Sequence, residues 1–600
     1  MILILGGTTE GRVAVKVADE AGKPFYYSTR SDIQAVDSHN GVRLSGGLDL
    51  DSMTLFCREH DIRLIIDAAH PFAKVLHDTV GNVSEQLGLP VVRLERIFPE
   101  HDTDIIWCRD FDHAVMLMKQ NGVSNLLALT GVKTIAALKP FWTDHDCHFR
   151  ILDREESLEL ATQQGFPAER LVYYQHGEPE DTVLQQLKPD AVITKESGLS
   201  GGFQEKVDAA RRAGIPVYAV MRPQLPSGFE TVTGEHTLRR AIEKYIPDFY
   251  PLRSGYTTGS CATAASKAAL TALLLGEELS TTQIQIPDGE LLTIPVTVLQ
   301  VTHDSAVASV IKDAGDDPDV TNGCTVVSTV RFSDRLGIHF LQGDGVGRVT
   351  LPGLGLEVGE PAVNPVPRKM IETELAGLLA ETVRDGAGLD VTISVPGGEE
   401  LATHTFNPKL GIVGGISIIG TSGIVRPFSS EAFVEAIRRE CEVALAVCPD
   451  RLVINSGARS ERFVKALYPE LPPQAYVHYG NYIGETLKIA QELGFRNVTM
   501  GIMMGKAVKL AQGNFDTHSR VVTMNREFIR EMAQEAAVPQ ECLARIDSMV
   551  LARELWDIIP RDNLKTFCNV VREHCHSFCD GLIPDGRLTI LIITDQGQVF

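Results

Sequence analysis

A short apolar run that meets a glycine-rich turn sets the tightest limit on the fold of this 600-residue chain. Residues 2–5 are Ile-Leu-Ile-Leu, two glycines follow, a helical pattern covers about 11–21, and a second apolar segment occupies 24–27. A strand, a turn, a helix and a strand in this order form a βαβ unit, which builds a parallel sheet with helices on its faces. We therefore expect an α/β domain here.

The glycine turn is a candidate site for the phosphates of a nucleotide, because a helix N-terminus directs free N–H groups and a positive dipole end toward it. The Walker pattern fails, since Arg12 and Val13 follow Gly11. The dinucleotide fingerprint G-x-G-x-x-G is met at its outer positions, with threonine in the middle. A plain βα turn remains the alternative. The predicted phosphate-binding residues are Gly6, Gly7, Thr8, Thr9 and Gly11.

The end of the second predicted strand indicates which dinucleotide would bind. An NAD-specific site usually has an acidic residue there for the ribose hydroxyls. This chain has Ser28, Thr29 and Arg30 instead. Hydroxyl groups and a guanidinium suit a 2′-phosphate, so the pattern favours NADPH over NADH. The alternative is a polar loop with one solvated arginine.

The strand and helix patterns then continue, with apolar strands at 64–67, 126–130, 191–194 and 216–220 and a helix at 204–213. Polar residues gather after the carboxyl ends of these strands, which is where open α/β sheets bind ligands.

Several separated motifs in this half carry a resemblance to a known family. GGTTEGR, DAAHPFA, TGVK, TKESGLSGGFQEK and VMRP resemble the precorrin-6A reductase family over residues 1–249. The resemblance implies a pair of Rossmann-like lobes and reduction of a ring double bond by a nicotinamide cofactor. It also implies that the 6–11 turn holds the pyrophosphate, while His70 and the 195–202 loop lie near the macrocycle.

His70 and Lys195 are therefore the candidate catalytic residues of this half, because reduction requires a proton as well as a hydride. Lys195 could also pair with carboxylates of the substrate. The alternatives are that His70 only caps the loop before Pro71 and that water or the macrocycle supplies the proton. The predicted substrate-binding residues of the loop are Ser197, Gly198 and Gly202.

Two prolines at 247 and 251 flank a linker, so we expect one domain over 1–249 and a second over 250–600. After the linker, a hydroxyl-rich turn runs into an alanine-rich helix that begins near Cys261. A helix dipole would lower the pKa of a thiol there, but we favour a packing role. Glycine and proline are then dense over 343–425, which is typical of tight turns between short strands, and an α/β pattern follows residue 431. The predicted fold class is thus multidomain, α/β and α+β, with a Gly/Pro-rich mixed β part and an α/β part in the second domain.

Long motifs over nearly all of 252–600 resemble the cobalt-precorrin-5B C1-methyltransferase family. They are SGYTTGSCATAASKAAL, IKDAGDDPDVTNG, GEPAVNPVPRKMI, VPGGEELATHTFNPKLGIVGGISIIGTSGIV and GKAVKLAQGNFDTHS. The resemblance implies methylation of a cobalt-bound ring by S-adenosylmethionine. Many relatives have histidine where Met503 stands here, so we take His518 as the catalytic candidate.

Loops after the predicted strands of the α/β part are the expected adenosylmethionine site, and basic or hydroxyl side chains are expected to bind the macrocycle. The expected cofactor residues are Gly457, Ser460, Glu461, Asn481 and Gly484. The expected substrate residues are Thr257, Thr258, Lys312, Asp313, Arg368, Lys506 and Lys509, with solvated surface charge as the alternative for the basic ones.

Composition limits the partners. A net charge of −22 disfavours binding to nucleic acid or anionic membranes, and no segment reads as a membrane span. Eleven scattered cysteines point to a reducing cytoplasm rather than a disulfide framework, and we expect no metal site at the His574–Cys579 cluster. The partners expected are tetrapyrroles, and homo-oligomerisation is left open.

The product of the second family is the substrate of the first, so the two resemblances support each other. They predict a bifunctional enzyme of cobalamin biosynthesis. Two alternatives stay open: a non-catalytic tetrapyrrole carrier, and an unrelated two-domain NADP-dependent dehydrogenase.

Overall fold

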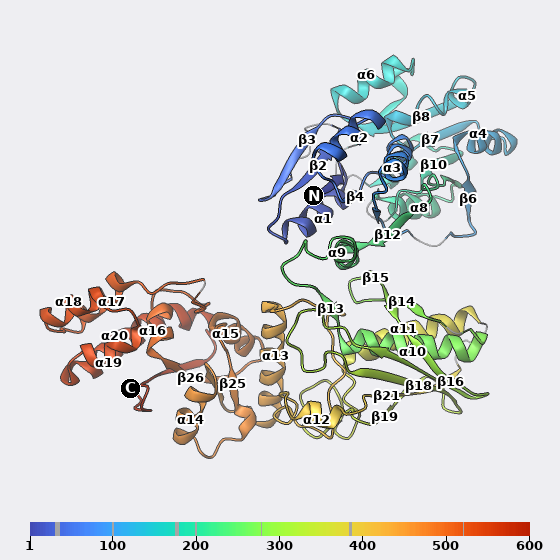
Figure 1. The fold of residues 1–600 in the computed structure, drawn as a ribbon. Coiled ribbons are helices and arrows are strands. Elements are labelled where there is room, and N and C mark those ends of the chain that lie inside the picture. The colour runs from blue at the N-terminus through green and yellow to red at the C-terminus, as the bar shows by residue number, and fades with distance from the viewer. Residues whose placement is uncertain are drawn as a thin grey trace. The chain divides into compact units, whose positions relative to one another are not determined.

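The computed structural model describes residues 1–30, 36–98, 101–174, 179–198, 201–277, 279–382, 387–519 and 521–600. These residues form two compact units, Met1–Pro251 and Leu252–Phe600, coloured from blue to red along the chain in Figure 1. Within the first unit the chain builds most of one lobe, then a second lobe, and returns to complete the first.

The first lobe is built on a six-stranded parallel sheet. Its strands are β1 (Ile2–Leu5), β2 (Phe25–Thr29), β3 (Gly41–Ser45), β4 (Leu64–Asp67), β5 (Val91–Glu95) and β12 (Phe229–Thr233), in the order β3-β2-β1-β4-β5-β12. Its helices are α1 (Thr9–Asp19), α2 (Leu50–Glu59), α3 (Lys74–Leu87) and α9 (Gly234–Tyr245). Successive side chains of a strand point to opposite faces. Ile2 and Ile4 accordingly pack with α1 and α9, whereas Leu3 and Leu5 pack with α2 and α3.

The second lobe repeats this architecture. Its strands are β6 (Ile105–Cys108), β7 (Asn125–Ala128), β8 (Asp146–Leu152), β9 (Leu171–Tyr174), β10 (Ala191–Lys195) and β11 (Val217–Val220), in the order β6-β11-β10-β7-β8-β9. Its helices are α4 (Phe111–Gln120), α5 (Lys139–Trp142), α6 (Glu155–Gln163), α7 (Glu180–Leu187) and α8 (Phe203–Arg212). Helices α4, α5 and α6 pack with one face of the sheet, and α7 and α8 with the other.

Each lobe has a point at which the direction of strand addition reverses. In the first lobe this point lies between β1 and β4, and in the second between β7 and β10. The loops that leave two such strands diverge to opposite faces and leave a crevice at their carboxyl ends, where ligands bind in sheets of this kind. The topology therefore provides two candidate binding crevices in the first unit.

The second unit begins with a mixed β part. Helices α10 (Thr258–Leu275) and α11 (Pro365–Glu381) lie side by side, and α10 packs on β17 and β18 of a five-stranded sheet (Figure 1). The alanine-rich sequence of α10 permits this close packing on several sides. The sheet has the order β16-β17-β18-β21-β19, with β16 (Thr297–Val301), β17 (Ser305–Ile311), β18 (Thr325–Ser333), β19 (Ile338–Gln342) and β21 (Gly388–Ser394). Short two-stranded ladders join β13 (Gly255–Tyr256) to β23 (Ile424–Val425), β14 (Thr281–Gln285) to β15 (Leu291–Pro295), and β20 (Arg348–Val349) to β22 (Ile412–Val413).

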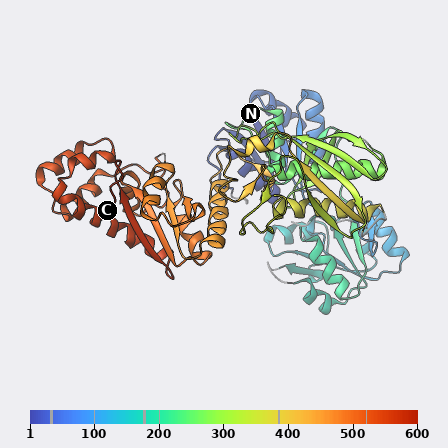
Figure 2. The ribbon, with the colours of Figure 1, turned by 90° about the horizontal axis from the view of Figure 1, so that it is seen from below.

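The C-terminal part of the second unit is a four-stranded parallel sheet, β25-β24-β26-β27, with a further reversal between β24 and β26. Figure 2 shows α13 (orange) between this part and the mixed β part, and its buried side chains pack with both. The strands are β24 (Leu452–Asn455), β25 (Tyr476–His478), β26 (Asn497–Met503) and β27 (Arg587–Ile593). The helices are α13 (Ser430–Val447), α14 (Ala458–Leu467), α15 (Ile483–Glu492), α16 (Met504–Leu510), α17 (Arg526–Glu535), α18 (Gln540–Ser548), α19 (Leu555–Ile558) and α20 (Arg561–Cys579). The short helix α12 (Gly398–Ala402) packs with the core of the mixed β part.

The predicted fold class is confirmed, including the paired parallel-sheet lobes, the turn-rich mixed part and the final α/β part. The dipole argument for Cys261 is wrong, because full burial raises the pKa of its thiol to about 12 and leaves the side chain a packing role. Cys575 and Cys579 are likewise buried on α20. In the described parts of the chain, no helix combines the length and apolar character needed to cross a membrane.

Gly6 allows the first βα turn to pack on the β2 strand. A Cβ atom at residue 6 would lie 2.3 Å from the ring of Tyr27, and one at Gly11 would lie 2.9 Å from the Gly6 Cα. Gly377, by contrast, is exposed within α11 and has no atom within 4 Å of its Cβ position.

The same substitution should therefore have opposite effects at these two glycines. We expect Gly6→Ala to destabilise the first unit by ~1–3 kcal/mol, because it overpacks the turn. We expect Gly377→Ala to stabilise the second unit by ~0.5–1 kcal/mol, because alanine favours the helix. Differential scanning calorimetry of the full chain measures both, and an unchanged melting temperature for Gly6→Ala would contradict the packing argument.

Candidate active sites

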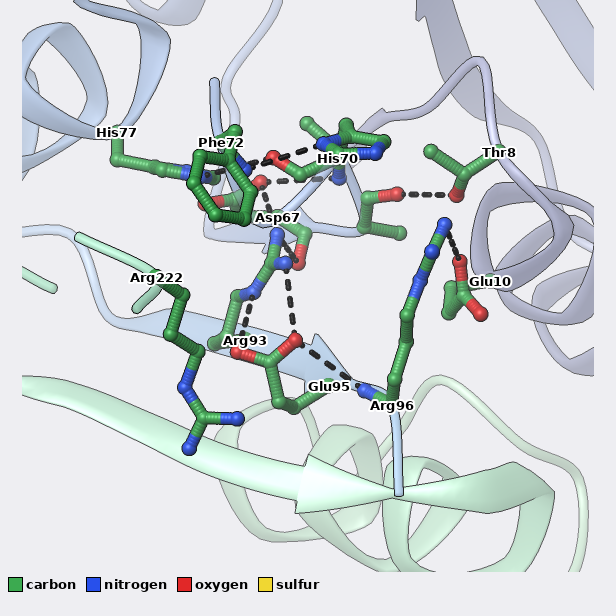
Figure 3. Close-up of polar contacts among 12 residues, drawn as sticks. Thr8, Glu10, Asp67, His70, Phe72, His77, Arg93, Glu95, Arg96 and Arg222 are labelled. Atoms are coloured by element: carbon green, nitrogen blue, oxygen red, sulfur yellow. Dashed lines mark hydrogen bonds and ion pairs between the residues drawn. The ribbon is translucent and has the colours of Figure 1, made fainter. Parts of the chain in front are cut away.

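One threonine joins the two loops at the crevice of the first lobe (Figure 3). The Thr8 hydroxyl accepts the Gly11 N–H at 3.1 Å and donates to the Ala68 carbonyl, after β4, at 2.7 Å. The Thr8 hydroxyl thus caps the N-terminus of α1 and also holds the loop that follows β4. This explains the threonine in the middle of the fingerprint, since glycine could make neither contact. Gly7, with φ +100°, and Thr9 are exposed on this turn.

Arg96, which follows β5, links this turn to the second lobe. Its guanidinium lies 3.0 Å from the carboxylate of Glu10, in the first turn of α1, and donates to the Ser197 carbonyl at 2.8 Å (Figure 3). Gly198 and Gly201 pack against the Arg96 side chain so closely that a Cβ atom at either would approach it within 2.9 Å. The 6–11 turn and the loop that follows β10 are therefore linked, through Glu10 and Ser197, by one arginine that sequence reasoning did not single out.

A buried network of charged side chains supports the β4 loop. The Asp67 carboxylate lies 2.9 Å from Arg93 Nη1 and 2.6 Å from His77 Nδ1, and Arg93 also pairs with Glu95 at 3.2 Å. Burial alone would raise the pKa of Asp67, but the His77 hydrogen bond and the Arg93 charge lower it. The four side chains are almost inaccessible to solvent. Such groups are stable in the interior only when paired.

His70 stands on the loop that this network holds. Its Nδ1 accepts the N–H of Phe72 at 3.1 Å. Burial, followed by the charges of Lys195 and Arg96, lowers the pKa of His70 to about 3. The imidazole is therefore neutral at pH 7 and carries its proton on Nε2. It can donate a hydrogen bond, but it is not the charged acid that a proton donor at neutral pH would be.

His70 lines a cavity of about 980 Å³ at the crevice of the second lobe. Two of the cations around it are neutralised locally, since Arg150 pairs with Glu180 and Arg212 with Asp181. Lys133, Lys195 and Lys206 have no carboxylate partner among the described residues. The charged lining consists of Lys133, Arg150, Glu180, Asp181, Lys195, Glu205, Lys206, Asp208 and Arg212.

Lys195 is the most perturbed of these cations. Its Nζ lies 5.4 Å from the centre of the Phe72 ring. Burial, and then the charges of Lys206 and Lys133, lowers the pKa of Lys195 to about 8. Burial also lowers the pKa of Lys206. Poorly hydrated ammonium groups favour an anionic ligand, so the cavity suits a molecule with several carboxylates, and the charges of Glu180 and Glu205 offset part of this effect at Lys206.

The other predicted residues of the first unit shape its loops. Ser28 and Thr29 are buried in β2, whereas Arg30 is exposed at its end; residues 31–35 lie outside the described part. The Ser197 hydroxyl donates to the Gly201 carbonyl at 3.1 Å. Gly198 and Gly202 have φ angles of +73° and +67°, and Gly202 immediately precedes α8.

In the mixed β part, the predicted substrate residues hold the fold. Thr257 and Thr258 are buried, and their hydroxyls contact Ser260 and Ile419. Lys312 is only 2 % exposed and pairs with Asp319 at 2.7 Å, so its charge is balanced within the fold, and its predicted role in substrate binding stays a prediction. Asp313 is also used locally, since it accepts the Gly315 N–H and pairs with Arg253.

Arg368 is also held by contacts within the fold, and its predicted role in substrate binding stays a prediction. Its guanidinium donates to the Val363 and Pro361 carbonyls at 2.7 and 3.1 Å and pairs with Glu360. It also stacks 5.1 Å from the Phe340 ring centre. These contacts fix the turn before α11.

Three of the predicted cofactor residues, Gly457, Ser460 and Glu461, lie at the crevice between β24 and β26. Gly457 precedes α14, has φ +148°, and has open space at its Cβ position, while the Ser460 hydroxyl donates to its carbonyl at 2.9 Å. Glu461 on α14 forms ion pairs with Lys465 and with His478, the last residue of β25. Burial would raise the pKa of Glu461, but hydrogen bonds from His478 and Lys465 lower it to about 2. Sequence reasoning missed His478, which has no motif around it.

A second group of predicted residues lies on the neighbouring loops. Lys506 Nζ donates to the Gly480 carbonyl, Lys509 Nζ donates to the Thr517 carbonyl, and the Thr517 N–H donates to the Asn481 carbonyl. Burial, and then the charge of Lys509, lowers the pKa of Lys506 to about 8. Gly484 packs against Phe515, and the His518 N–H donates to the Asp516 carboxylate. Asn481, Gly484, Lys506, Lys509 and His518 are therefore brought to one end of the parallel sheet.

Comparison with known proteins divides the chain in the same way. A family model described as precorrin-6x reductase CbiJ/CobK matches residues 1–243. The CbiD model matches residues 247–427, and the model of the CbiD C-terminal domain matches 516–600.

Relatives of high similarity cover the second unit. A cobalt-precorrin-5B C(1)-methyltransferase from Prosthecochloris aestuarii is 45% identical over 58% of this chain and 94% of its own length. The enzyme of the same name from a Geobacillus strain is 44% identical over 54% of this chain and 88% of its own. Among solved structures, a CobK precorrin-6A reductase aligns with 41% of this chain and 97% of its own, with 22% identity and a TM-score of 0.34.

The two halves of the chain thus match an oxidoreductase family and a methyltransferase family, one after the other. The chain belongs to the CbiD family of cobalt-precorrin-5B C(1)-methyltransferases and carries a CbiJ/CobK reductase domain before it, which makes it a bifunctional enzyme of cobalamin biosynthesis.

Proposed function

We propose that the two units act in sequence on one macrocycle. The second unit methylates carbon 1 of cobalt-precorrin-5B, which gives cobalt-precorrin-6A, and the first unit reduces this product to the 6B form. The observation that carries the reductase half is the cavity that His70 lines together with three lysines, which have no ion-pair partner among the described residues. A precorrin bears several carboxylates and needs such a lining.

The dinucleotide would lie over the turn between β1 and α1. Gly7, whose Cβ position is open, allows a pyrophosphate to approach the backbone, Gly6 and Gly11 let the turn pack closely beneath it, and the N-terminus of α1 favours its charge. The exposed Arg30 at the end of β2 supports NADPH rather than NADH, because its guanidinium can pair with a 2′-phosphate.

Reduction adds a hydride to one ring atom and a proton to another. The nicotinamide supplies the hydride when it is bound. Neutral His70 donates a hydrogen bond through Nε2 and orients the reacting group. Lys195 is protonated below its pKa of about 8, so it can pair with a substrate carboxylate or deliver the proton.

The charge of Lys195 should appear in the pH dependence of reduction. We expect kcat/KM with NADPH to fall as pH rises through about 8, because the free enzyme then loses this ammonium group. Lys195→Met should lower kcat/KM at pH 7 by ~10–100-fold, the value of a hydrogen bond to a charged group. Lys195→Arg should retain binding and flatten the alkaline limb.

Lys119→Met provides the matched control, since Lys119 lies on α4 and pairs with Asp144 at the surface. It should leave kcat/KM unchanged. If kcat/KM of Lys195→Arg still falls as pH rises through about 8, the fall must come from the titration of a group other than Lys195.

Methyl transfer needs alignment more than acid–base chemistry, since the macrocycle is rich in electrons. S-adenosylmethionine supplies the methyl group of its sulfonium. We propose that the Ser456–Ser460 turn receives this cofactor and that Glu461 accepts hydrogen bonds from the ribose hydroxyls. An acidic residue usually does this at the end of the second strand. In this chain the residue at the end of that strand is His478, which forms an ion pair with the Glu461 carboxylate of α14. Lys506, Lys509 and His518 then face the macrocycle.

The Glu461 assignment predicts a specific loss of affinity. Glu461→Gln should raise the Kd of S-adenosylhomocysteine by about tenfold, because a charged acceptor is lost. The affinity of the 2′-deoxy analogue should differ less between wild type and variant, since this analogue keeps only the 3′-hydroxyl as a donor to residue 461. Isothermal titration calorimetry measures both.

Glu485→Gln is the control variant, because Glu485 pairs with Lys488 on the exposed side of α15. It should bind both ligands as wild type does. Equal discrimination between the two ligands in wild type and Glu461→Gln would remove Glu461 from the ribose site.

The whole function is tested by mass spectrometry with cobalt-precorrin-5B. Adenosylmethionine alone should add one methyl group, and NADPH should then add two hydrogens, at a lower concentration than NADH requires. Binding with no change in mass would indicate a carrier. Failure to bind any precorrin, with turnover of another substrate, would indicate an unrelated dehydrogenase.

The cellular setting is also proposed rather than established. All eleven cysteines are free, and ten of them are buried, which suits a reducing compartment such as the cytoplasm. Homo-oligomerisation stays an open prediction, which sedimentation of the purified chain decides.

A further inference from the structure

His77 is a buried histidine that the proposed mechanism does not use. It lies on α3, is 1 % exposed, and has an oxygen at each ring nitrogen. Nδ1 is 2.6 Å from an Asp67 carboxylate oxygen, and Nε2 is 3.2 Å from the His70 carbonyl oxygen (Figure 3).

The chemistry of these two oxygens fixes the protonation of the ring. A carbonyl oxygen cannot donate a hydrogen bond, and an ionised carboxylate cannot either. Arg93 Nη1, at 2.9 Å, and the Ala69 N–H, at 3.1 Å, both donate to Asp67 Oδ1, which favours the ionised form. Both nitrogens of His77 must therefore donate, or one buried lone pair would face an oxygen at a cost of ~1–3 kcal/mol.

The net charge of the buried cluster also favours a His77 ring with a proton on each nitrogen. The ionisable groups that face each other here are Asp67 from β4, Arg93 and Glu95 from β5, and His77 from α3. Two carboxylates and one guanidinium leave a net negative charge in the interior. A doubly protonated His77 makes the cluster neutral, which is the arrangement that burial requires.

The hydrogen bond from His77 acts on the backbone of His70. The His70 carbonyl also accepts the Ala73 N–H at 2.8 Å, while the His70 ring accepts the Phe72 N–H. The main chain and the ring of His70 are thus both fixed from within the same loop, and His77 connects that loop to Asp67. The ring of His70 is left with Nε2–H to use toward the cavity.

We propose that His77 is held as an imidazolium and is a positioning residue for the reductase, because it fixes His70 at the cavity. This proposal rests on the proposed reductase function. It predicts that loss of His77 slows the reduction step, with little change in dinucleotide affinity, since the 6–11 turn is held separately by Thr8.

Nuclear magnetic resonance of the full chain labelled with [15N]histidine tests the protonation state. The resonances absent from His77→Gln belong to His77, and we expect both of its ring nitrogens to carry a proton at pH 7. A neutral tautomer at pH 7 would overturn the imidazolium assignment. The nuclear magnetic resonance result does not depend on which reaction the first unit catalyses.

Kinetics test the positioning role. His77→Gln should lower kcat for reduction by about tenfold or more, leave the Kd of NADPH within about threefold, and leave methyl transfer by the second unit unchanged. In the His70→Gln background the further change should have no effect, because His77 acts through His70. Multiplicative losses in the double variant would overturn the proposal.

Two controls separate this result from misfolding and from a wrong function. His113→Gln changes a histidine of α4 whose Nδ1 accepts the Arg109 N–H, and it should leave kcat unchanged. Normal NADPH affinity in His77→Gln shows that the first lobe is folded. No reduction by wild type would reject the proposed function, whereas a normal kcat in His77→Gln rejects only the role of His77.

Discussion

The carboxylate of Asp67 is the contact on which the site of the first unit depends. It ends β4, binds Arg93 from β5, receives a hydrogen bond from His77 of α3, and accepts the Ala69 N–H of the loop that carries His70. The continuous segment of β4, its loop and α3 therefore meets β5 at one buried charge. Removing one partner of such a buried pair costs ~3–5 kcal/mol, because the other charge stays in the interior. The loop geometry follows from this network.

Arg96 extends the network from one lobe to the other. It stands next to Glu95, pairs with Glu10 beside the dinucleotide turn, and binds the backbone of the loop with Lys195 through Ser197. A hydride donor and an acceptor react only when they are held in contact, so a rigid link between their loops has a direct catalytic value. The Nε of Arg96 is buried and has no hydrogen-bond partner among the described residues.

The two units share one physical feature at their crevices. Burial lowers the pKa of Lys195 in the first unit and of Lys506 in the second to about 8 in each case. Each lysine also has a second lysine close enough to lower its pKa further. A poorly hydrated cation gains more from a carboxylate than a solvated one does. The chain can therefore be acidic as a whole and still bind polyanions locally.

The sequence by itself determined the parallel lobes, the turn-rich middle part and the helices and strands around each motif, because apolar periodicity and glycine turns are local signals. It also determined the two families, since their motifs are long. Only the tertiary structure decided which polar residues reach a crevice. Lys312 and Arg368 look like surface cations in sequence, yet the fold pairs the buried Lys312 with Asp319 and binds Arg368 to the Val363 carbonyl before α11. His77, Arg96 and His478 belong to no motif, and their roles arise from partners on other strands and helices. Such pairing depends on the topology of the sheets, which no short stretch of sequence contains.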